Sequence, residues 1–153
     1  MSAESSSREY PNRPFVGVGA VVVDSGRILM IKRGKPPRMG DWSLPGGAQK
    51  LGEVVDETAR REVGEETGLE VEILGLIDVV DSIRKDDDGA VQFHYTLVDV
   101  LARPYGGELR AGGDAMDARW FARAELDGMK LWSETYRIID LAIEMEAALA
   151  AGA

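Results

Sequence analysis

The sequence predicts an α/β fold in which a mixed sheet carries helices on both faces. Three observations support this fold class. Runs of β-branched residues fill the N-terminal region, an acidic amphipathic helix lies before the middle of the chain, and further strand patterns lead to a second amphipathic helix. The expected order of elements is β-β-α-β-β-β-α.

The N-terminal elements form the expected start of a single domain. Residues 1–13 are polar and Ser-rich, so we expect a flexible tail there and a domain over 14–150. Residues 15–23 are apolar and β-branched, and 27–32 alternate in polarity. The Asp-Ser-Gly turn between them predicts a β-hairpin.

The remaining elements follow from periodicity and from cap residues. Alternation is strongest at 91–97, where Val, Phe, Tyr and Leu occupy every second position. The expected elements are a helix at 54–67, strands at 71–80, 91–97 and 118–121, a turn or short helix at 123–126, and a final helix capped by Ser133.

Composition excludes several classes of partner. The 153 residues include 18 Lys and Arg against 27 Asp and Glu, a net charge of −9, which argues against nucleic-acid binding through a basic surface. There is no cysteine, hence no disulfide and no zinc–thiolate site. No apolar run approaches the roughly 20 residues of a membrane span. We therefore expect a cytoplasmic protein with no membrane partner.

The segment from 47 to 69, GAQKLGEVVDETARREVGEETGL, carries the chemical signal of the chain. It fits the pattern G-x5-E-x7-R-E-U-x-E-E-x-G-U, where U is aliphatic, at all nine specified positions. In order, these are Gly47, Glu53, Arg61, Glu62, Val63, Glu65, Glu66, Gly68 and Leu69. Gly68 is expected to end the helix in the left-handed conformation.

Helical geometry places the carboxylates of this segment at the edge of its apolar stripe. At 3.6 residues per turn, Glu62 and Glu66 project in nearly the same direction as Val55. A charged helix is ordinarily a solvated face, but these glutamates border the buried side. Inward carboxylates favour a hard cation with oxygen ligands, and the interpretation is Mg²⁺ or Mn²⁺.

These residues resemble the signature of the Nudix hydrolase family. The preceding Trp-Ser-Leu-Pro-Gly-Gly run makes the chain similar to the ADP-ribose-pyrophosphatase-like group. The resemblance covers the chain from about Pro14 and implies a Nudix-type α/β/α sandwich. It also implies metal binding by the carbonyl of Gly47 and by Glu62, Glu65 and Glu66.

The family resemblance also implies catalytic roles. Glu65 is a ligand or the general base, Glu53 contacts the metal through water or hydrogen-bonds a ligand, and Arg61 holds the glutamates in place. Asp114 stands where relatives commonly have a glutamate that completes the site. It is one methylene shorter, so either metal-site action or the role of a simple loop acid remains open for Asp114.

Candidate substrate contacts lie before and within the motif. Arg33 and Arg38 are expected to meet phosphate, and Lys50 replaces an acid found in many relatives. The interpretation is hydrolysis of ADP-ribose or a nucleoside diphosphate sugar, with a small-molecule nucleotide as partner and a homodimer possible. The alternatives are a (d)NTP pyrophosphohydrolase and a non-catalytic module that binds a nucleotide metabolite.

Overall fold

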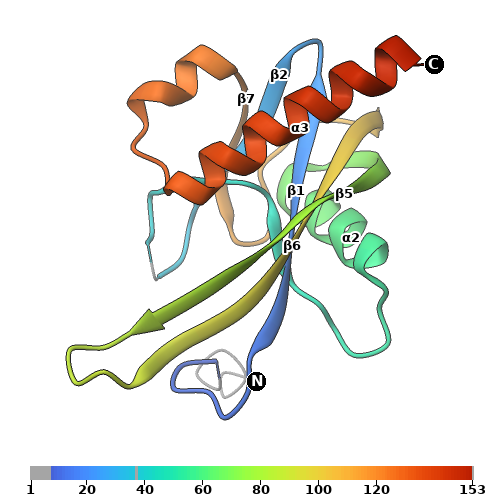
Figure 1. Cartoon of the computed structure of the whole chain (residues 1–153). Coiled ribbons are helices and arrows are strands. Elements are labelled where there is room, and N and C mark those ends of the chain that lie inside the picture. Colours follow the sequence, from blue (N-terminus) through green and yellow to red (C-terminus); the bar gives the residue numbers. More distant parts are fainter. Residues whose placement is uncertain (1–7, 37, 153) are drawn as a thin grey trace.

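The computed structural model describes residues 8–36 and 38–152 (Figure 1). Most of the expected tail, residues 1–7, lies outside the described residues. Within residues 8–13, the hydroxyl of Tyr10 donates to Asp86 Oδ2 at 2.8 Å, and its backbone N–H donates to the carbonyl of Gln92 at 2.8 Å. This part of the chain is therefore bonded to the segment around Asp86 and Gln92.

The expected N-terminal hairpin is confirmed. Strands β1 (Phe15–Asp24) and β2 (Arg27–Arg33) pair antiparallel through a two-residue turn. Ser25 and Gly26 both adopt positive φ angles, 52° and 77°. A two-residue turn with two positive φ angles matches the right-handed twist of the flanking strands.

The strands of the described residues form a mixed sheet. Its main order is β3-β2-β1-β6-β5, while β4 pairs with β1 and β7 pairs with β2. Strand β1 is parallel to β6, and the other pairs are antiparallel. The bounds are β3 (Trp42–Ser43), β4 (Gly46–Ala48), β5 (Leu69–Lys85), β6 (Val91–Gly107) and β7 (Ala115–Ala122).

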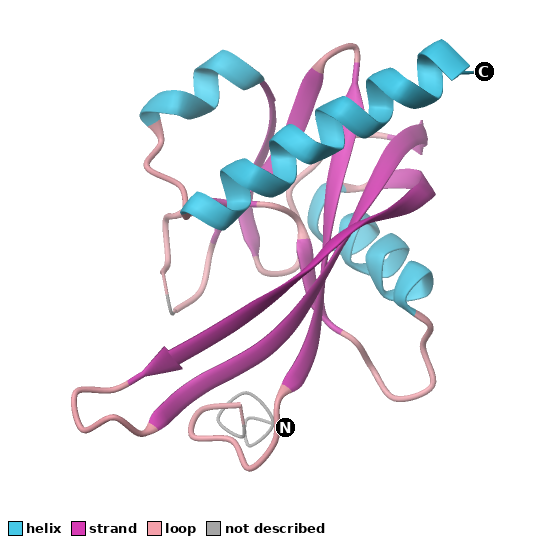
Figure 2. Cartoon of the chain, viewed as in Figure 1, coloured by secondary structure: helices cyan, strands magenta, loops and turns pink. Residues whose placement is uncertain are grey.

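Helices cover both faces of this sheet, as Figure 2 shows, so the predicted three-layer class is confirmed. Helix α2 (Val55–Thr67) buries Ala59 and Val63 against one face. Helix α3 (Ser133–Gly152) buries Ile138, Ile139 and Ala142 against the other. The 3-10 helix η1 (Arg123–Gly128) lies where a turn or short helix was predicted.

Several boundaries differ from the prediction. Strand β5 extends beyond 71–80 at both ends, and β6 continues ten residues beyond 97 to Gly107. Register shifts along this pair leave residues such as Leu74 and Ile77 of β5 without a partner on β6, and these bulges interrupt the polarity alternation. Helix α3 begins at Ser133 itself, the residue expected to cap it. The short strands β3 and β4 were not predicted because they offer too few residues for a periodicity.

Candidate active site

Helix α2 supplies the candidate site, and its two ends are fixed locally. At the N-terminus, the N–H of Val54 donates to Glu57 Oε1 at 3.1 Å. At the C-terminus, Gly68 has φ 75° and ψ −1°, and its N–H donates to the carbonyl of Gly64. The predicted left-handed end is therefore confirmed. Only glycine adopts this conformation without penalty, so the chain can turn directly into β5.

The structure places two of the three clustered glutamates inward. Glu66 is 6% exposed, and the side chain of Glu62 is 15% exposed. The side chain of Glu65 is 51% exposed and lies at the rim. The N–H of Gly46 donates to Glu66 Oε1 at 2.8 Å, which ties the helix to strand β4 across twenty residues.

Gly47 provides the surface on which the Glu62 carboxylate rests. A Cβ at residue 47 would lie 2.5 Å from both Cδ and Oε1 of Glu62. Any larger residue would push this carboxylate away, since real Cβ atoms do not approach so closely. The glycine expected to approach a ligand is therefore also required for the position of Glu62.

Arg61 links the acidic residues through its guanidinium group. Its Nε donates to Glu53 Oε2 at 2.6 Å and its Nη2 to Glu53 Oε1 at 3.0 Å, a bidentate pair. Its Nη1 donates to Glu62 Oε1 at 2.7 Å and, at 3.5 Å, to Glu65 Oε2. Nη2 also reaches the carbonyl of Ala48 at 3.2 Å. This geometry supports the expected role of Arg61 in positioning the glutamates.

Glu53 is held by two further donors besides Arg61. The N–H of Lys50 and the hydroxyl of Thr58 both donate to Glu53 Oε1, at 2.9 and 3.0 Å. The hydrogen bonds from Arg61 are the main reason that the pKa of Glu53 falls to about 2. Glu53 is therefore an ionised acceptor fully engaged within the protein. That arrangement favours a positioning role over proton transfer.

The two inward glutamates show the opposite electrostatic behaviour. Burial raises the pKa of Glu62, although Arg61 partly opposes this shift. Burial also raises the pKa of Glu66 to about 8, and the nearby charges of Glu62 and Asp114 add to the effect. Arg61 is the cation that acts on Glu62 and Arg33 the one that acts on Glu66, and neither offsets the effect of burial, so the two desolvated carboxylates are short of positive charge. Perturbed acids of this kind cluster at functional sites.

Asp114 lies close enough to raise the pKa of both inward glutamates. Its own carboxylate is 67% exposed and pairs with Lys35 Nζ at 2.8 Å. The N–H of Gly34 donates to the Asp114 carbonyl at 2.8 Å, which fixes this loop beside the end of β2. Asp114 therefore belongs to the rim of the site, and Lys35 is its partner.

The three expected substrate contacts occupy different positions. Arg33 lies near enough to Glu66 to lower its pKa, so it faces the site. Arg38 is exposed and has a φ of 62°, and within the described residues its side chain forms no hydrogen bond or ion pair with the motif glutamates. Lys50 is exposed, and its backbone N–H rather than its side chain bonds to Glu53.

The donor set fits a divalent cation with hard oxygen ligands. Within the described ranges, no three acidic or histidine side chains form a ready-made metal cage. Mg²⁺, however, commonly uses one or two carboxylates and completes its shell with water and substrate phosphate. Glu62 and Glu66 supply such a pair, and Glu66 Oε2 accepts no hydrogen bond from the part of the chain that the structure describes. The shortage of positive charge around them would be relieved by the cation.

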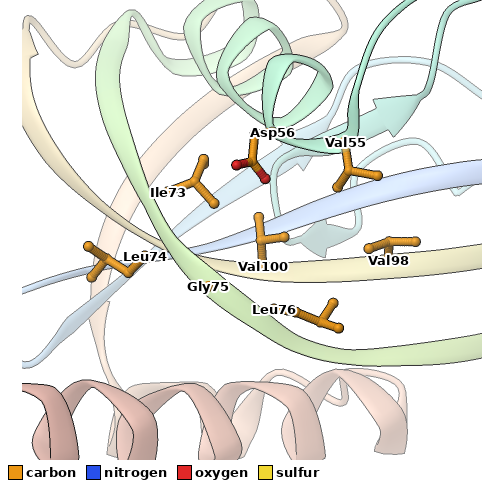
Figure 3. A pocket seen from close by; sticks show the side chains of 8 residues that line it. All are labelled: Val55, Asp56, Ile73, Leu74, Gly75, Leu76, Val98 and Val100. Carbon is orange, nitrogen blue, oxygen red and sulfur yellow. The ribbon is translucent and has the colours of Figure 1, made fainter.

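A separate hollow of about 470 Å³ lies between the start of α2 and strands β5 and β6 (Figure 3). Apart from Asp56, it presents mainly aliphatic side chains, and it contains none of the motif acids. It therefore lacks the groups needed for phosphate chemistry. Its lining comprises Val55, Asp56, Ile73, Leu74, Gly75, Leu76, Val98 and Val100.

Sequence reasoning missed three contributors to the site. The backbone N–H of Gly46 could not be assigned because a strand as short as β4 leaves no pattern. Thr58 lies five residues after Glu53, a spacing that allows contact at a helix start, but a lone threonine carries little signal. The pairing of Lys35 with Asp114 joins residues far apart in sequence.

An acidic helix packed against a glycine-rich strand of a mixed sheet defines an α/β domain with a candidate cation site. A family model described as the NUDIX domain matches residues 13–141. The chain therefore belongs to the NUDIX family, and the resemblance inferred from the motif is confirmed.

Individual relatives carry names of two kinds. An ADP-ribose pyrophosphatase of Methanocaldococcus jannaschii is 40% identical over 108 residues, 71% of this chain and 62% of the relative. The 8-oxo-dGDP phosphatase NUDT18 of Mus musculus is 33% identical over 116 residues, 73% of this chain and 33% of that protein. The chain thus spans only part of these two curated relatives.

The fold also matches solved structures. A crystal structure of a MutT NUDIX hydrolase from Burkholderia pseudomallei aligns with a TM-score of 0.73 and 35% identity, covering 85% of this chain and 98% of that one. Among the helices that the structure describes, none is both long and apolar enough to span a membrane.

Proposed function

We propose that this chain hydrolyses a phosphoanhydride bond in a nucleoside diphosphate linked to another moiety, with ADP-ribose or a nucleoside diphosphate sugar as the substrate. The observation that carries the proposal is the inward pair Glu62 and Glu66. Glu66 accepts a hydrogen bond from the N–H of Gly46, and Glu62 rests against Gly47 and accepts one from Arg61. The ADP-ribose pyrophosphatase of M. jannaschii supports the choice of substrate.

The residues of the chain divide the work by position. Glu62 and Glu66 would hold Mg²⁺ or Mn²⁺, with the rim residue Glu65 and the Gly47 carbonyl as further ligands. When bound, such a cation neutralises phosphoryl charge and lowers the pKa of a coordinated water. Glu53 and Arg61 keep the acidic side chains in register.

Two rim residues remain candidates for the general base. Glu65 is half exposed and bonded only weakly to Arg61, so it is free to face an incoming water. Asp114 lies on the opposite loop and already has a cation partner in Lys35. The charge of Arg33 lowers the pKa of Glu66, so Arg33 is close to the inward glutamates and is our candidate for the cation that binds the substrate phosphate.

A substrate panel tests this proposal. Purified protein is incubated with ADP-ribose, nucleoside diphosphate sugars, dNTPs and 8-oxo-dGTP, with Mg²⁺ or with excess EDTA, and the phosphate-containing products are separated. We expect turnover of ADP-ribose or a sugar conjugate that stops with EDTA. Turnover that survives full chelation would contradict the metal-dependent chemistry.

The second candidate is a (d)NTP pyrophosphohydrolase that removes damaged nucleotides. The similarity to the 8-oxo-dGDP phosphatase NUDT18 favours it, and the same panel separates it from the first. A non-catalytic module that only binds a nucleotide metabolite is less consistent with a motif in which every acidic position is filled. Binding of the whole panel without any product would favour that module.

A further inference from the structure

Asp99 in β6 is a buried carboxylate that the proposed chemistry does not use. It is 7% exposed, and within residues 8–36 and 38–152 its carboxylate forms no hydrogen bond and no ion pair. Among the described residues, every side-chain oxygen or nitrogen that is completely buried has a hydrogen-bond partner. Because the Asp99 carboxylate has none, its oxygens must retain a small solvent-accessible area. An unpaired acid at this depth is unfavourable unless something binds it.

The position of Asp99 connects it to the candidate active site. Gly19 of β1 pairs with Asp99 on one side and with Gly46 on the other. Asp99 therefore lies two strands from the Gly46–Gly47 strand, about 10 Å away at the usual strand spacing. Its Oδ1 also leans over Gly19, since a Cβ on Gly19 would collide with it. The carboxylate thus lies over Gly19, on the face of the sheet that packs against α3.

The surface beside Asp99 suits a nucleoside. Alternation along β1 and β6 places Phe15, Gly17, Tyr95 and Leu97 on the same face as Asp99. The rings of Phe15 and Tyr95 lie 6.2 Å apart and are only partly buried. Leu97 and the Asp99 carboxylate cover the backbone of Gly17 and Gly19, so a flat base would stack on the partly exposed aromatic rings beside Asp99.

The charged residues around Asp99 do not supply a hydrogen-bond donor or an ion-pair partner for its carboxylate. Burial and the charge of Asp78 on β5 raise the pKa of Asp99 to about 6. Arg137 on α3 opposes this shift, but its guanidinium is bonded to Asp78 at 2.9 Å and to Glu134 at 2.8 Å. Near neutral pH the carboxylate is therefore mainly ionised and has no donor of its own.

We propose that Asp99 determines specificity at the nucleoside end of the substrate by accepting a hydrogen bond from an N–H group of a purine base. This inference rests on the proposed function, because it assumes a nucleotide whose phosphates lie at the Glu62–Glu66 pair. An ionised carboxylate only accepts hydrogen bonds, and both adenine and guanine carry amino donors. A base bound there would donate a hydrogen bond to the Asp99 carboxylate, which has no donor among the described residues.

Binding measurements test the inference without requiring turnover. Calorimetric titrations with AMP, GMP and ribose 5-phosphate, in Mg²⁺, compare the wild type with Asp99→Asn and Asp81→Asn. Asp81→Asn is a matched control, because it removes the same charge from β5 at a position paired with Thr96, on the opposite face. Thermal unfolding of each variant verifies the fold.

We expect Asp99→Asn to weaken AMP and GMP binding about tenfold or more, the scale of a lost charged hydrogen bond. Ribose 5-phosphate should bind both proteins equally, and Asp81→Asn should bind all three ligands like the wild type. The inference is overturned if Asp99→Asn binds the nucleotides normally, if it loses ribose 5-phosphate equally, or if the wild type binds neither nucleotide better than ribose 5-phosphate. Absence of hydrolysis in the substrate panel would count against the proposed function alone.

Discussion

Glu66 combines deep burial, a single backbone donor and a neighbouring carboxylate, and these features make it the most informative side chain to change. We expect Glu66→Gln and Glu62→Gln each to lower kcat by at least about 10²-fold, because removing charge from the cation site weakens transition-state stabilisation. Without metal, both variants should unfold at a higher denaturant concentration than the wild type, because each removes a buried carboxyl group whose pKa is raised by burial.

Steady-state kinetics at saturating Mg²⁺ and urea unfolding in EDTA measure the two effects. Asp56→Asn serves as the control, because Asp56 is an exposed acid in the first turn of the same helix. Near-wild-type rates for both glutamine variants would show that the ligand assignment is wrong.

Asp114 gives a second prediction for a single residue. It perturbs both inward glutamates from the rim, so we expect Asp114→Asn to lower kcat/KM about 10²-fold, the scale of a lost general base. Asp114→Glu should retain most activity, since the longer side chain reaches further. Asp117→Asn is the matched control, because Asp117 pairs outward with Arg119 at 2.8 Å. A silent Asp114→Asn would assign Asp114 to the loop and leave Glu65 as the base.

The sequence was sufficient to predict the contacts that depend on helical spacing. The inward direction of Glu62 and Glu66 and the contact of Arg61 with Glu65 follow from 3.6 residues per turn. It was insufficient for contacts that depend on tertiary packing. The bond from Gly46 to Glu66 and the pairing of Lys35 with Asp114 join separate elements, and no periodicity encodes their approach.

At the scale of secondary structure, the close approach of α2 and β4 determines the position of the Glu62 carboxylate. Gly47→Ala would place a Cβ against the Glu62 carboxylate. We expect kcat/KM to fall at least about tenfold with a smaller change in stability, because the flexible end of Glu62 can move. Gly64→Ala is the control: its Cβ would meet nothing closer than 3.9 Å, and alanine favours the helix by about 1 kcal/mol. Equal activity of the two variants would contradict this account.

The bounds of the helices and strands show which elements the sequence patterns predict and which they do not. The α2 bounds were predicted within one residue because cap and periodicity agree. Strands β5 and β6 run longer than predicted because their pairing bridges the bulges that break alternation. Strands β3 and β4 exist only because β2 and β1 lie alongside them, so a local sequence of two or three residues cannot reveal them.

The free energy of unfolding of the whole molecule should depend on pH through the titration of Asp99. Its pKa is about 6 in the folded chain against an ordinary value of 3.8, so the folded state holds the proton more tightly. Stability from this group is therefore present at low pH and is lost as pH rises from about 4 through 6. The full loss corresponds to about 3 kcal/mol.

Asp99→Asn lacks this dependence, because the amide does not titrate. We expect the variant to exceed the wild type in unfolding free energy by about 3 kcal/mol at pH 8 and by about half that at pH 5. Urea unfolding of both proteins in EDTA at the two pH values measures the difference. A constant difference between the proteins would mean that Asp99 titrates normally.

Metal binding should likewise be visible in the unfolding of the whole chain, independently of any substrate. A ligand that binds only the folded state at 100 times its Kd stabilises it by about 2.7 kcal/mol. For a chain of this length, about 1 kcal/mol moves the thermal midpoint by roughly 2–4 °C. Mg²⁺ should therefore raise the wild-type midpoint by roughly 5–10 °C over the EDTA sample. KCl at equal ionic strength controls for screening of the net charge of −9.

The double variant Glu62→Gln with Glu66→Gln tests whether the rise in the thermal midpoint with Mg²⁺ comes from metal binding at the candidate site. It should start from a higher midpoint in EDTA, because it lacks the two carboxyl groups whose pKa values are raised mainly by burial, and should gain little from Mg²⁺. Differential scanning calorimetry across a Mg²⁺ series gives both quantities from one set of samples. If the double variant gained as much as the wild type, the cation would have to bind elsewhere on this acidic chain.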